Sequence, residues 1–367
     1  MKKNIVIFYP SFEKGGVTNI LRNLVKDKKS KNYNIYLISS KNLIYSNNKK
    51  KNYFFLPIKN KTIPLIPQRF TSSLIAVFTL ISLLNRLKSK TMVHSMQSNV
   101  AAIIACLLKN KKIVIRNSEN PLYSTFYSEN KFFGFLVFIL KLIFYNFADG
   151  IITNSQGSAN DLKNFVFNKK KIFHIYNPYI KKINYKIYKK QNYIINIGRL
   201  RKQKDHKTLL SAFYLFSKVN SNYKLLILGH GNLKSELLLL SKKLGIKKKV
   251  IFKGWVKNTK LYLKKSKIFV LSSVYEGLGN VLLDAINYNV PCISTNCPSG
   301  PNEILLNGRG GYLVKVKSPE LLAKKMLMSV KRYNHSLKLN NEAKKKLNRF
   351  LISKNTEKYF NYLENFL

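Results

Sequence analysis

Two carboxylates stand beside a glycine-rich turn in the second half of the chain, in a sequence with only 15 Asp and Glu residues. Glu276 closely follows the apolar run 268–273, and Asp284 comes one helical turn into the next apolar segment. If the run is a strand of a parallel sheet, Glu276 lies at its carboxyl end, at the rim of a ligand-binding cleft. The N–H groups of 277–281 then point outward from a helix start and can bind an anion such as diphosphate. Alternatively, Glu276 only caps the helix and Asp284 is polar surface.

Two cations follow another predicted strand, residues 193–198. Arg199 and Lys204 would stand at the mouth of the same cleft, where they could neutralise a departing diphosphate. The chain contains no Asp-x-Asp pair to hold a divalent ion there, so we expect no metal site. The alternative interpretation is that both side chains are ordinary surface charges.

Glycine turns mark two more places where a ligand could approach the backbone. Gly229 and Gly231 end one apolar run and open a helical pattern, although a single Gly-x-Gly is a weak signal. Gly15 and Gly16 follow the first predicted strand and begin a helix, which is a close-approach position.

These residues need a scaffold of alternating strands and helices. Short β-rich runs recur with helical patterns between them, which predicts parallel α/β sheets. A lysine-rich interval at 181–192 separates two such series and is interpreted as a linker. The predicted fold class is therefore α/β, with two Rossmann-like parallel-sheet domains, 1–180 and 193–351, facing one another across a cleft. The predicted strands are 5–9, 34–39, 92–96, 112–117, 150–155, 172–176, 193–198, 224–229, 250–255, 268–273, 290–295 and 311–316.

The charge is strongly positive, because 66 Lys and Arg residues stand against 15 Asp and Glu, giving a net charge of +51. Only nine of the 66 are arginine, the residue that planar recognition of phosphates and bases favours. No nucleic-acid-binding motif is recognisable, so we expect no nucleic-acid partner. The charge does match an anionic membrane surface. The three cysteines, Cys106, Cys292 and Cys297, match no zinc spacing and are expected to be buried.

No secretory signal is predicted, since the first apolar run is short and ends at Pro10. We therefore expect a cytoplasmic protein. Two longer apolar stretches, 74–87 and 132–147, fall short of the roughly 20 residues that a membrane-spanning helix needs. The second stretch is either a buried helix or an interfacial helix that dips its apolar face into a membrane.

The segment YEGLGNVLLDAINYNVPCISTNCPSGPNEIL, residues 275–305, resembles the donor-binding signature of the retaining glycosyltransferases of family 4, whose fold is GT-B. Other landmarks occur in the family's order: the glycine pair at 15 and 16, and the segments 148–162, 175–178, 198–213, 225–237 and 250–256. The resemblance covers nearly the whole chain. It is specific for the family and unspecific for the sugar.

The resemblance implies a donor site in the second domain. Arg199 and Lys204 would bind the nucleotide diphosphate and stabilise its departure. Glu276 matches the first glutamate of the family's E-x7-E motif, which contacts the transferred sugar. The amides of Gly277, Leu278, Gly279, Asn280 and Val281 would hold the sugar or the phosphates. Asp284 stands where a second glutamate usually binds the ribose hydroxyls, and its shorter side chain implies a longer or water-bridged contact.

Other candidates follow from the same resemblance. His94 matches a position where the family often carries a histidine near the donor sugar and the acceptor, and a structural role for it is equally open. Arg116, Asn117 and Glu119 are acceptor-side candidates. A helix at about 352–367 is expected to pack back on the first domain. The remaining donor-side candidates are glycines and the segment expected to hold the base: Gly16, Gly229, Gly231, Gly254 and Val256.

The activity implied is retaining transfer of a hexose or N-acetylhexosamine, with a UDP-sugar favoured as the donor and no metal or cofactor. The acceptor would be a polyprenyl-diphosphate-linked or growing glycan of a bacterial lipopolysaccharide, capsule or glycoprotein. The protein would lie peripherally on the cytoplasmic face of the inner membrane. Two alternatives remain open. A catalytically inactive sugar-nucleotide-binding protein would fit the change to Asp284, and a nucleic-acid-binding protein would explain the charge but not the glycine turns.

Overall fold

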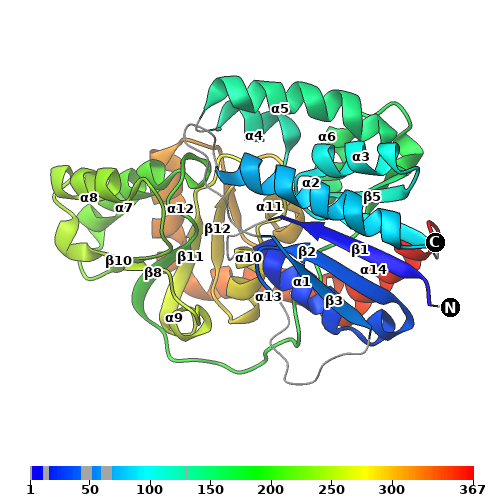
Figure 1. Ribbon diagram of the computed structural model, residues 1–367. Coiled ribbons are helices and arrows are strands. Elements are labelled where there is room, and N and C mark those ends of the chain that lie inside the picture. The colour runs from blue at the N-terminus through cyan, green and yellow to red at the C-terminus, as the bar shows by residue number, and fades with distance from the viewer. Residues whose placement is uncertain (1, 11–15, 43–51, 59–67, 89, 129) are drawn as a thin grey trace. The chain divides into compact units, whose positions relative to one another are not determined.

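The computed structural model describes residues 2–10, 16–42, 52–58, 68–88, 90–128 and 130–367, so Gly15 lies outside the described residues. The chain divides into two compact units, which are drawn in Figure 1. Unit 1 comprises Met1–Asn154, Ser158–Lys181 and Arg349–Leu367, and unit 2 comprises Ser155–Gly157 and Lys182–Asn348. Each unit is built around its own parallel sheet.

The sheet of unit 1, as far as the structure describes it, has the strand order β3-β2-β1-β4-β5-β6-β7, and all its strands run parallel. The first strand therefore lies inside the sheet, as in doubly wound α/β folds. The strands are β1 Asn4–Tyr9, β2 Asn34–Ser39, β3 Tyr53–Pro57, β4 Thr91–Ser95, β5 Lys112–Asn117, β6 Gly150–Thr153 and β7 Ile172–His174.

Both faces of this sheet are covered, which explains why its strands are continuous apolar runs. Side chains alternate along β1, so Ile5 and Ile7 pack with α1 (Gly16–Lys26) and α14 (Ile352–Glu364). Val6 and Phe8 point to the other face, where they pack with α2 (Gln68–Arg86) and α3 (Asn99–Leu108). The remaining helices of this part of the chain are α4 Pro121–Phe126, α5 Lys131–Phe144 and α6 Gln156–Leu162.

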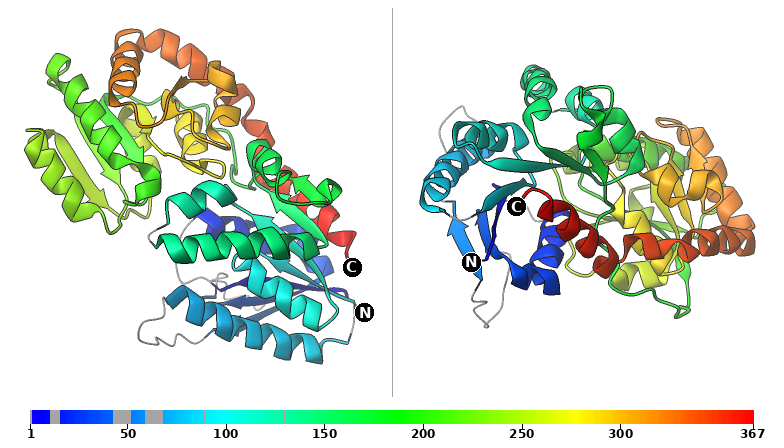
Figure 2. Two further views of the ribbon diagram at one scale, coloured as in Figure 1. Left: turned by 90° about the horizontal axis from the view of Figure 1, so that it is seen from above. Right: turned by 90° about the vertical axis from the view of Figure 1, so that its right-hand side faces the viewer.

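The helix α14 follows unit 2 in the chain but belongs to unit 1. Figure 2 shows it in red beside the blue α1, and the two helices are in contact. Tyr359, Phe360 and Leu363 insert from α14 into the apolar core on that face. The first unit is therefore completed by residues from the end of the sequence.

The described sheet of unit 2 has the strand order β10-β9-β8-β11-β12-β13, again all parallel. Its strands are β8 Gln191–Ile197, β9 Lys224–Leu228, β10 Val250–Gly254, β11 Ser266–Leu271, β12 Cys292–Thr295 and β13 Tyr312–Val314. One face is covered by α7 (His206–Val219) and α12 (Pro319–Lys331), and the other by α9 (Lys260–Lys265) and α10 (Asn280–Asn287). The other helices are α8 Lys234–Lys243, α11 Pro301–Ile304 and α13 Tyr333–Lys345.

The prediction of parallel α/β sheets is confirmed, and each predicted strand is present within a few residues of its expected place. The strand β3 was not predicted. It lies at the sheet edge and is half-buried or exposed along its length, so it lacks the fully buried pattern of the other strands. None of the described helices is both long enough and apolar enough to cross a membrane.

The interval expected to be a linker holds specific contacts with unit 2. The Asn184 N–H donates to Asn287 Oδ1 at 2.8 Å, and Lys190 Nζ donates to the Tyr288 carbonyl at 3.0 Å. Burial and, to a lesser extent, the charges of Lys267 and Lys344 together lower the pKa of Lys190 to about 8. This segment is therefore fixed against unit 2 from residue 182 onward.

Candidate functional site

The main donor-side candidates meet at the carboxyl edge of the unit 2 sheet. The strand β8 comes first in this sheet's sequence, with β9 on one side and β11 on the other, so the winding of the chain reverses between β8 and β11. The loop after β8 carries Arg199 and Lys204, and the loop after β11 carries Glu276. Ligands of open α/β sheets bind at such a reversal point.

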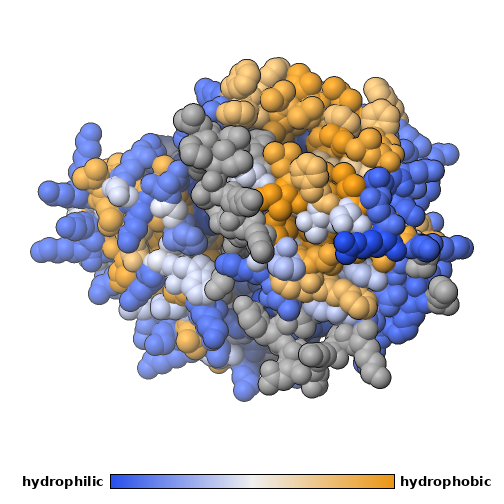
Figure 3. Space-filling view, viewed as in Figure 1, coloured by the Kyte–Doolittle hydropathy of each residue, from blue (hydrophilic) through white to orange (hydrophobic). Residues whose placement is uncertain are grey.

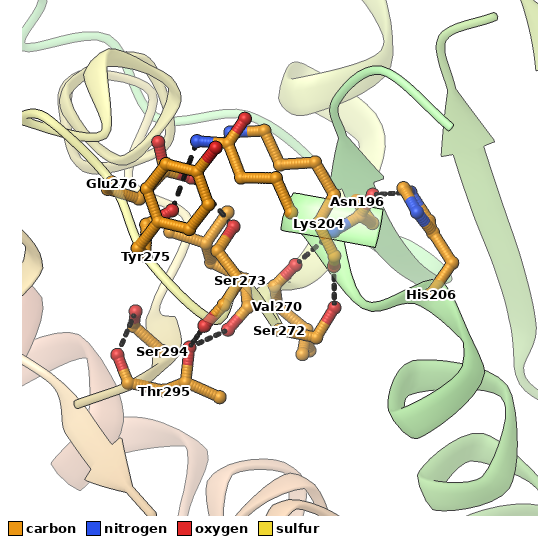
Figure 4. Close-up of polar contacts among 12 residues, drawn as sticks. Asn196, Lys204, His206, Val270, Ser272, Ser273, Tyr275, Glu276, Ser294 and Thr295 are labelled. Carbon is orange, nitrogen blue, oxygen red and sulfur yellow. Dashed lines mark hydrogen bonds and ion pairs between the residues drawn. The ribbon is translucent and has the colours of Figure 1, made fainter. Parts of the chain in front are cut away.

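A buried ion pair joins the two loops, as Figure 4 shows. Lys204 Nζ lies 2.5 Å from Glu276 Oε1, and the two side chains are only 15% and 7% exposed. Ser273 Oγ donates to the same carboxylate oxygen at 2.6 Å. The hydrogen bonds of this carboxylate within the described residues are made by Oε1, and none is made by Oε2. The site therefore offers a fixed carboxylate and a cation side by side.

Backbone contacts hold the two loops in register. Ser272 Oγ donates to the Lys204 carbonyl at 2.8 Å, and the Val274 N–H donates to the Gln203 carbonyl at 2.9 Å. Lys204 ends a 3-10 turn, Lys202–Lys204, and Asp205 then caps α7 by accepting from the Thr208 N–H at 3.3 Å. Each charged side chain thus comes from a short, well-supported loop rather than from a free one.

A buried polar pair lies under the same edge. His206 Nε2 and Asn196 Oδ1 are 3.0 Å apart, and Asn196 Nδ2 donates to the Val270 carbonyl at 2.8 Å. Burial and, to a lesser extent, the charge of Lys204 together lower the pKa of His206 to about 3. The ring is therefore neutral, and this pair links β8 to β11 beneath Lys204.

The start of α10 presents unpaired backbone donors. The N–H groups of Gly277, Leu278 and Gly279 donate no hydrogen bond within the described parts of the chain. Gly279 has φ 85° and occupies the N-cap position without a side-chain cap, a conformation that favours glycine. Free N–H groups at a helix start attract negative charge. This turn stands directly beside Glu276 in the chain and can hold phosphate or sugar oxygens.

The other donor-side residues lie around this centre. Arg199 is exposed just beyond the end of β8, and Asp284 is half-buried one turn into α10. Asn280 and Val281 form the first turn of that helix and are partly exposed.

The glycines after β9 are explained by packing. A Cβ on Gly229 would lie 1.9 Å from the Gly198 carbonyl oxygen, and one on Gly231 would lie 2.3 Å from the Leu200 oxygen. The Gly229 N–H donates to the Gly254 carbonyl at 2.8 Å, so the loops after β8, β9 and β10 are fixed together. Gly254 has φ 70° and, like Val256, is partly exposed. Their contact with a donor stays a prediction.

In unit 1, the His94 side chain is buried and is not accessible to a ligand in this conformation. Its ring is 1% exposed at the end of β4, and Nδ1 lies 3.0 Å from the Val114 carbonyl. Nε2 has no hydrogen-bond partner among the described residues. Burial lowers the pKa of His94 to about 4, and the nearby charge of Arg116 contributes to this. The ring is therefore neutral, with the proton on Nδ1, and its catalytic role stays a prediction.

Arg116 and Asn117 are buried at the end of β5, where both hold the chain together. Arg116 donates to Tyr359 Oη of α14 at 3.1 Å, to Asn177 Oδ1 at 2.6 Å and to Ser118 Oγ. Asn117 Nδ2 donates to the Glu119 carbonyl at 2.7 Å.

Glu119 itself is half exposed, 3.8 Å from Lys141 Nζ. Gly16 is the exposed first residue of α1. Of the acceptor-side candidates, Glu119 is thus the one whose side chain is accessible.

Sequence reasoning missed Ser273 and Thr295. Ser273 fixes Glu276, and Thr295 Oγ1 donates to the Ser273 carbonyl at 2.5 Å from the neighbouring strand. No spacing signal identifies them, because the contacts depend on the register between β11 and β12.

Comparison with known proteins agrees with this fold. Residues 14–179 match the family model Glycosyltransferase Family 4, and residues 180–346 match Glycosyl transferases group 1. A solved structure, Anabaena Alr3699/HepE in complex with UDP-glucose, superimposes with a TM-score of 0.77 at 15% identity and covers 99% of both chains. These matches define a glycosyltransferase of the GT-B fold.

Two curated relatives are also named as glycosyltransferases. An uncharacterized glycosyltransferase of Methanocaldococcus jannaschii is 30% identical over 83% of this chain and 77% of its own. The N-acetylgalactosamine-N,N'-diacetylbacillosaminyl-diphospho-undecaprenol 4-alpha-N-acetylgalactosaminyltransferase of Campylobacter jejuni is 34% identical over 59% of this chain and 60% of its own. The chain belongs to glycosyltransferase family 4, which confirms the resemblance seen in the sequence.

Proposed function

We propose that this protein transfers a sugar, with retention of configuration, from a UDP-hexose or UDP-N-acetylhexosamine to a lipid-linked or growing glycan. The reaction needs neither metal nor cofactor, and nucleic acid is not a partner. The product belongs to a bacterial surface polysaccharide or a glycoprotein glycan. The protein works in the cytoplasm, peripherally on the anionic cytoplasmic face of the inner membrane.

The observation that carries the proposal is the Lys204–Glu276 pair beside the unpaired amides of residues 277–279. A nucleoside diphosphate that leaves from the anomeric carbon needs positive charge and N–H donors around its phosphates. Lys204, Arg199 and the amides supply both. Glu276 Oε2 takes a sugar hydroxyl and stabilises positive charge on the anomeric carbon. Asp284 takes the ribose hydroxyls, and the backbone at Gly254–Val256 holds the base.

The acceptor is proposed from the relatives. The Campylobacter enzyme is named for a diphospho-undecaprenol acceptor and transfers N-acetylgalactosamine. A lipid-linked acceptor of that kind is anionic and membrane-bound, and it fits a protein with a net charge of +51. Glu119 is the accessible carboxylate that we place on the acceptor side.

The test is a screen of the purified protein against UDP-, GDP- and ADP-sugars in the presence of a chelator. Released nucleotide and thermal shift are measured. We expect one donor class to bind and to be hydrolysed slowly, with both effects lost in Glu276→Ala. The matched control is Glu236→Ala, which removes the carboxylate of an exposed Lys207–Glu236 pair in the same unit and should leave both signals intact.

Three other results would each contradict a different part of the proposal. Donor binding without turnover, with any acceptor supplied, would identify an inactive sugar-nucleotide-binding protein. Tight, steeply salt-dependent binding of nucleic acid with no response to any sugar nucleotide would overturn the proposal. Activity that disappears with the chelator would overturn metal independence.

A further inference from the structure

The helix α5 exposes an apolar face that folding does not use. Gly134 is its one fully buried residue within Lys131–Phe144. The exposed large side chains are Phe132, Phe133, Phe135, Leu136, Ile139 and Ile143, with Phe132 73% exposed and Ile143 51% exposed. Residues 132, 136, 139 and 143 are spaced at three and four positions, so they form one stripe along the helix. Single exposed apolar side chains are common, but a contiguous apolar stripe of this kind indicates an interaction surface.

The opposite face of α5 does hold the helix to unit 1. Phe138, Leu142 and Tyr145 line a small cavity together with Leu162 and Phe165. Lys141 also lies on this inner side, where its ammonium pairs with Glu119 at 3.8 Å. The one charge that interrupts the apolar segment in the sequence is therefore turned away from the exposed stripe. Both faces of the helix are apolar, and only the inner one is needed for packing.

Neighbouring helices extend the apolar surface. The helices α3 and α5 are in contact, as are α2 and α3. Figure 3 shows apolar side chains gathered over α5 and over α2 and α3 beside it. The exposed members from α2 and α3 are Leu74, Phe78, Ile104, Leu107 and Leu108. These residues and the α5 stripe are called the α5 face.

Cations stand at both ends of α5. Lys131 is exposed at its first turn. At the other end, Asn146 Oδ1 accepts from the Phe167 N–H at 2.8 Å, and Lys171 Nζ donates to the Asn146 carbonyl at 3.2 Å. These contacts bring the exposed Phe167 and the exposed run Lys169–Lys170 to the end of the helix. A helix of 14 residues is about 21 Å long, too short to cross a bilayer of roughly 30 Å but suited to lie along its surface.

We infer that the α5 face docks on an anionic lipid bilayer, with the α5 axis parallel to the membrane and the apolar stripe at the level of the lipid headgroups. The inference rests on the proposed membrane association and assigns it to a surface. Charge complementarity favours an anionic bilayer over a second copy of the chain. A chain of net charge +51 repels a second copy of itself, whereas lysines beside an apolar helix face attract acidic lipids.

The experiment is co-sedimentation of the full chain with vesicles of phosphatidylcholine containing phosphatidylglycerol, and with vesicles of phosphatidylcholine alone. The test variant is Phe132→Ser/Phe135→Ser/Ile139→Ser. The matched control removes three exposed leucines of unit 2, Leu238→Ser/Leu239→Ser/Leu261→Ser. Phe132→Ser alone is a milder second variant in case the triple change disturbs folding. Binding of a soluble UDP-sugar is measured for every variant.

We expect wild type and control to bind the acidic vesicles within twofold of each other, and binding by the test variant to fall at least tenfold. All variants should bind the soluble donor equally. Equal vesicle binding by the test variant and wild type would overturn the inference while leaving the membrane association in place. No vesicle binding by wild type would overturn both. A dimer that the test variant abolishes, without vesicle binding, would assign the face to a second copy. Loss of donor binding alone concerns the proposed function and leaves the docking result standing.

Discussion

Breaking the Lys204–Glu276 pair should lower both stability and activity, but by separable routes. Lys204→Met leaves the Glu276 carboxylate 7% exposed, with Ser273 as its remaining side-chain partner. Removing one partner of a fully buried pair costs about 3 to 5 kcal/mol, and the 15% exposure of Lys204 with the remaining Ser273 contact reduces this to about 2 to 3 kcal/mol. Adding Glu276→Gln removes the uncompensated charge and should restore about 1 to 2 kcal/mol.

The chain's single tryptophan provides the assay. Trp255 lies in unit 2 and is half exposed, so its fluorescence during urea unfolding reports the unit that contains the pair. Lys204→Met should lower the urea midpoint by about 1 M, for a slope of about 2 to 3 kcal/mol per M. The double variant should recover about half of that shift.

Activity should not recover with stability. A hydrogen bond from a cation to the departing diphosphate contributes about 1.5 to 3 kcal/mol, so Lys204→Met should lower kcat/KM by about 10- to 150-fold. The double variant should be at least as inactive, since it also lacks the Glu276 carboxylate. Recovery of transfer in the double variant would refute the catalytic roles and reduce the pair to a structural contact. A Lys204→Met midpoint equal to that of wild type would refute the energetic reasoning.

Three other predictions follow from the same structure. Burial lowers the pKa of His94 to about 4, so between pH 6.5 and pH 4 the unfolded chain binds a proton that the folded chain does not. Stability of unit 1 should therefore fall by about 3 kcal/mol as pH drops through that window, and His94→Gln should flatten the fall in urea midpoints followed by circular dichroism. Tyr359→Phe leaves the buried Arg116 Nε without its acceptor. The free energy of unfolding should fall by about 1 to 3 kcal/mol in the same circular dichroism assay. An unchanged urea midpoint would mean that α14 docks through apolar contacts alone. Gly229→Ala places a Cβ 1.9 Å from a carbonyl oxygen and should cost about 3 kcal/mol in the tryptophan-monitored transition, with wild-type stability contradicting the packing role.

Much of the fold could be predicted because most strands are buried on both faces. Runs such as Ile5–Tyr9 and Ile268–Leu271 are apolar at every position, a pattern typical of strands in a parallel sheet that is covered on both faces. The strand β3 was not predicted, because it lies at the sheet edge, where a strand need not be apolar at every position. The sequence also indicated that Lys204 and Glu276 lie in loops after buried strands, and the structure has them in the loops after β8 and β11.

Contacts between distant elements could not be predicted. The direct pairing of Lys204 with Glu276 depends on β8 lying next to β11, and the burial of Arg116 depends on α14 returning to unit 1. The sequence also does not show which face of α5 packs inward, because apolar residues occur all round the helix. No periodicity separates Phe138, which packs inward, from Ile139, which is exposed.

The return of α14 to unit 1 has a consequence for synthesis of the chain. A ribosome makes residues 182–348 before it makes the helix that completes the first core, so all of unit 2 is synthesised while unit 1 still lacks α14. Until α14 arrives, the α1 side of the first sheet lacks its cover of Tyr359, Phe360 and Leu363. A nascent chain interrupted at any point before α14 therefore carries an open apolar surface that chaperones and proteases recognise. Only chains that extend through α14 can therefore close the apolar core of the first unit.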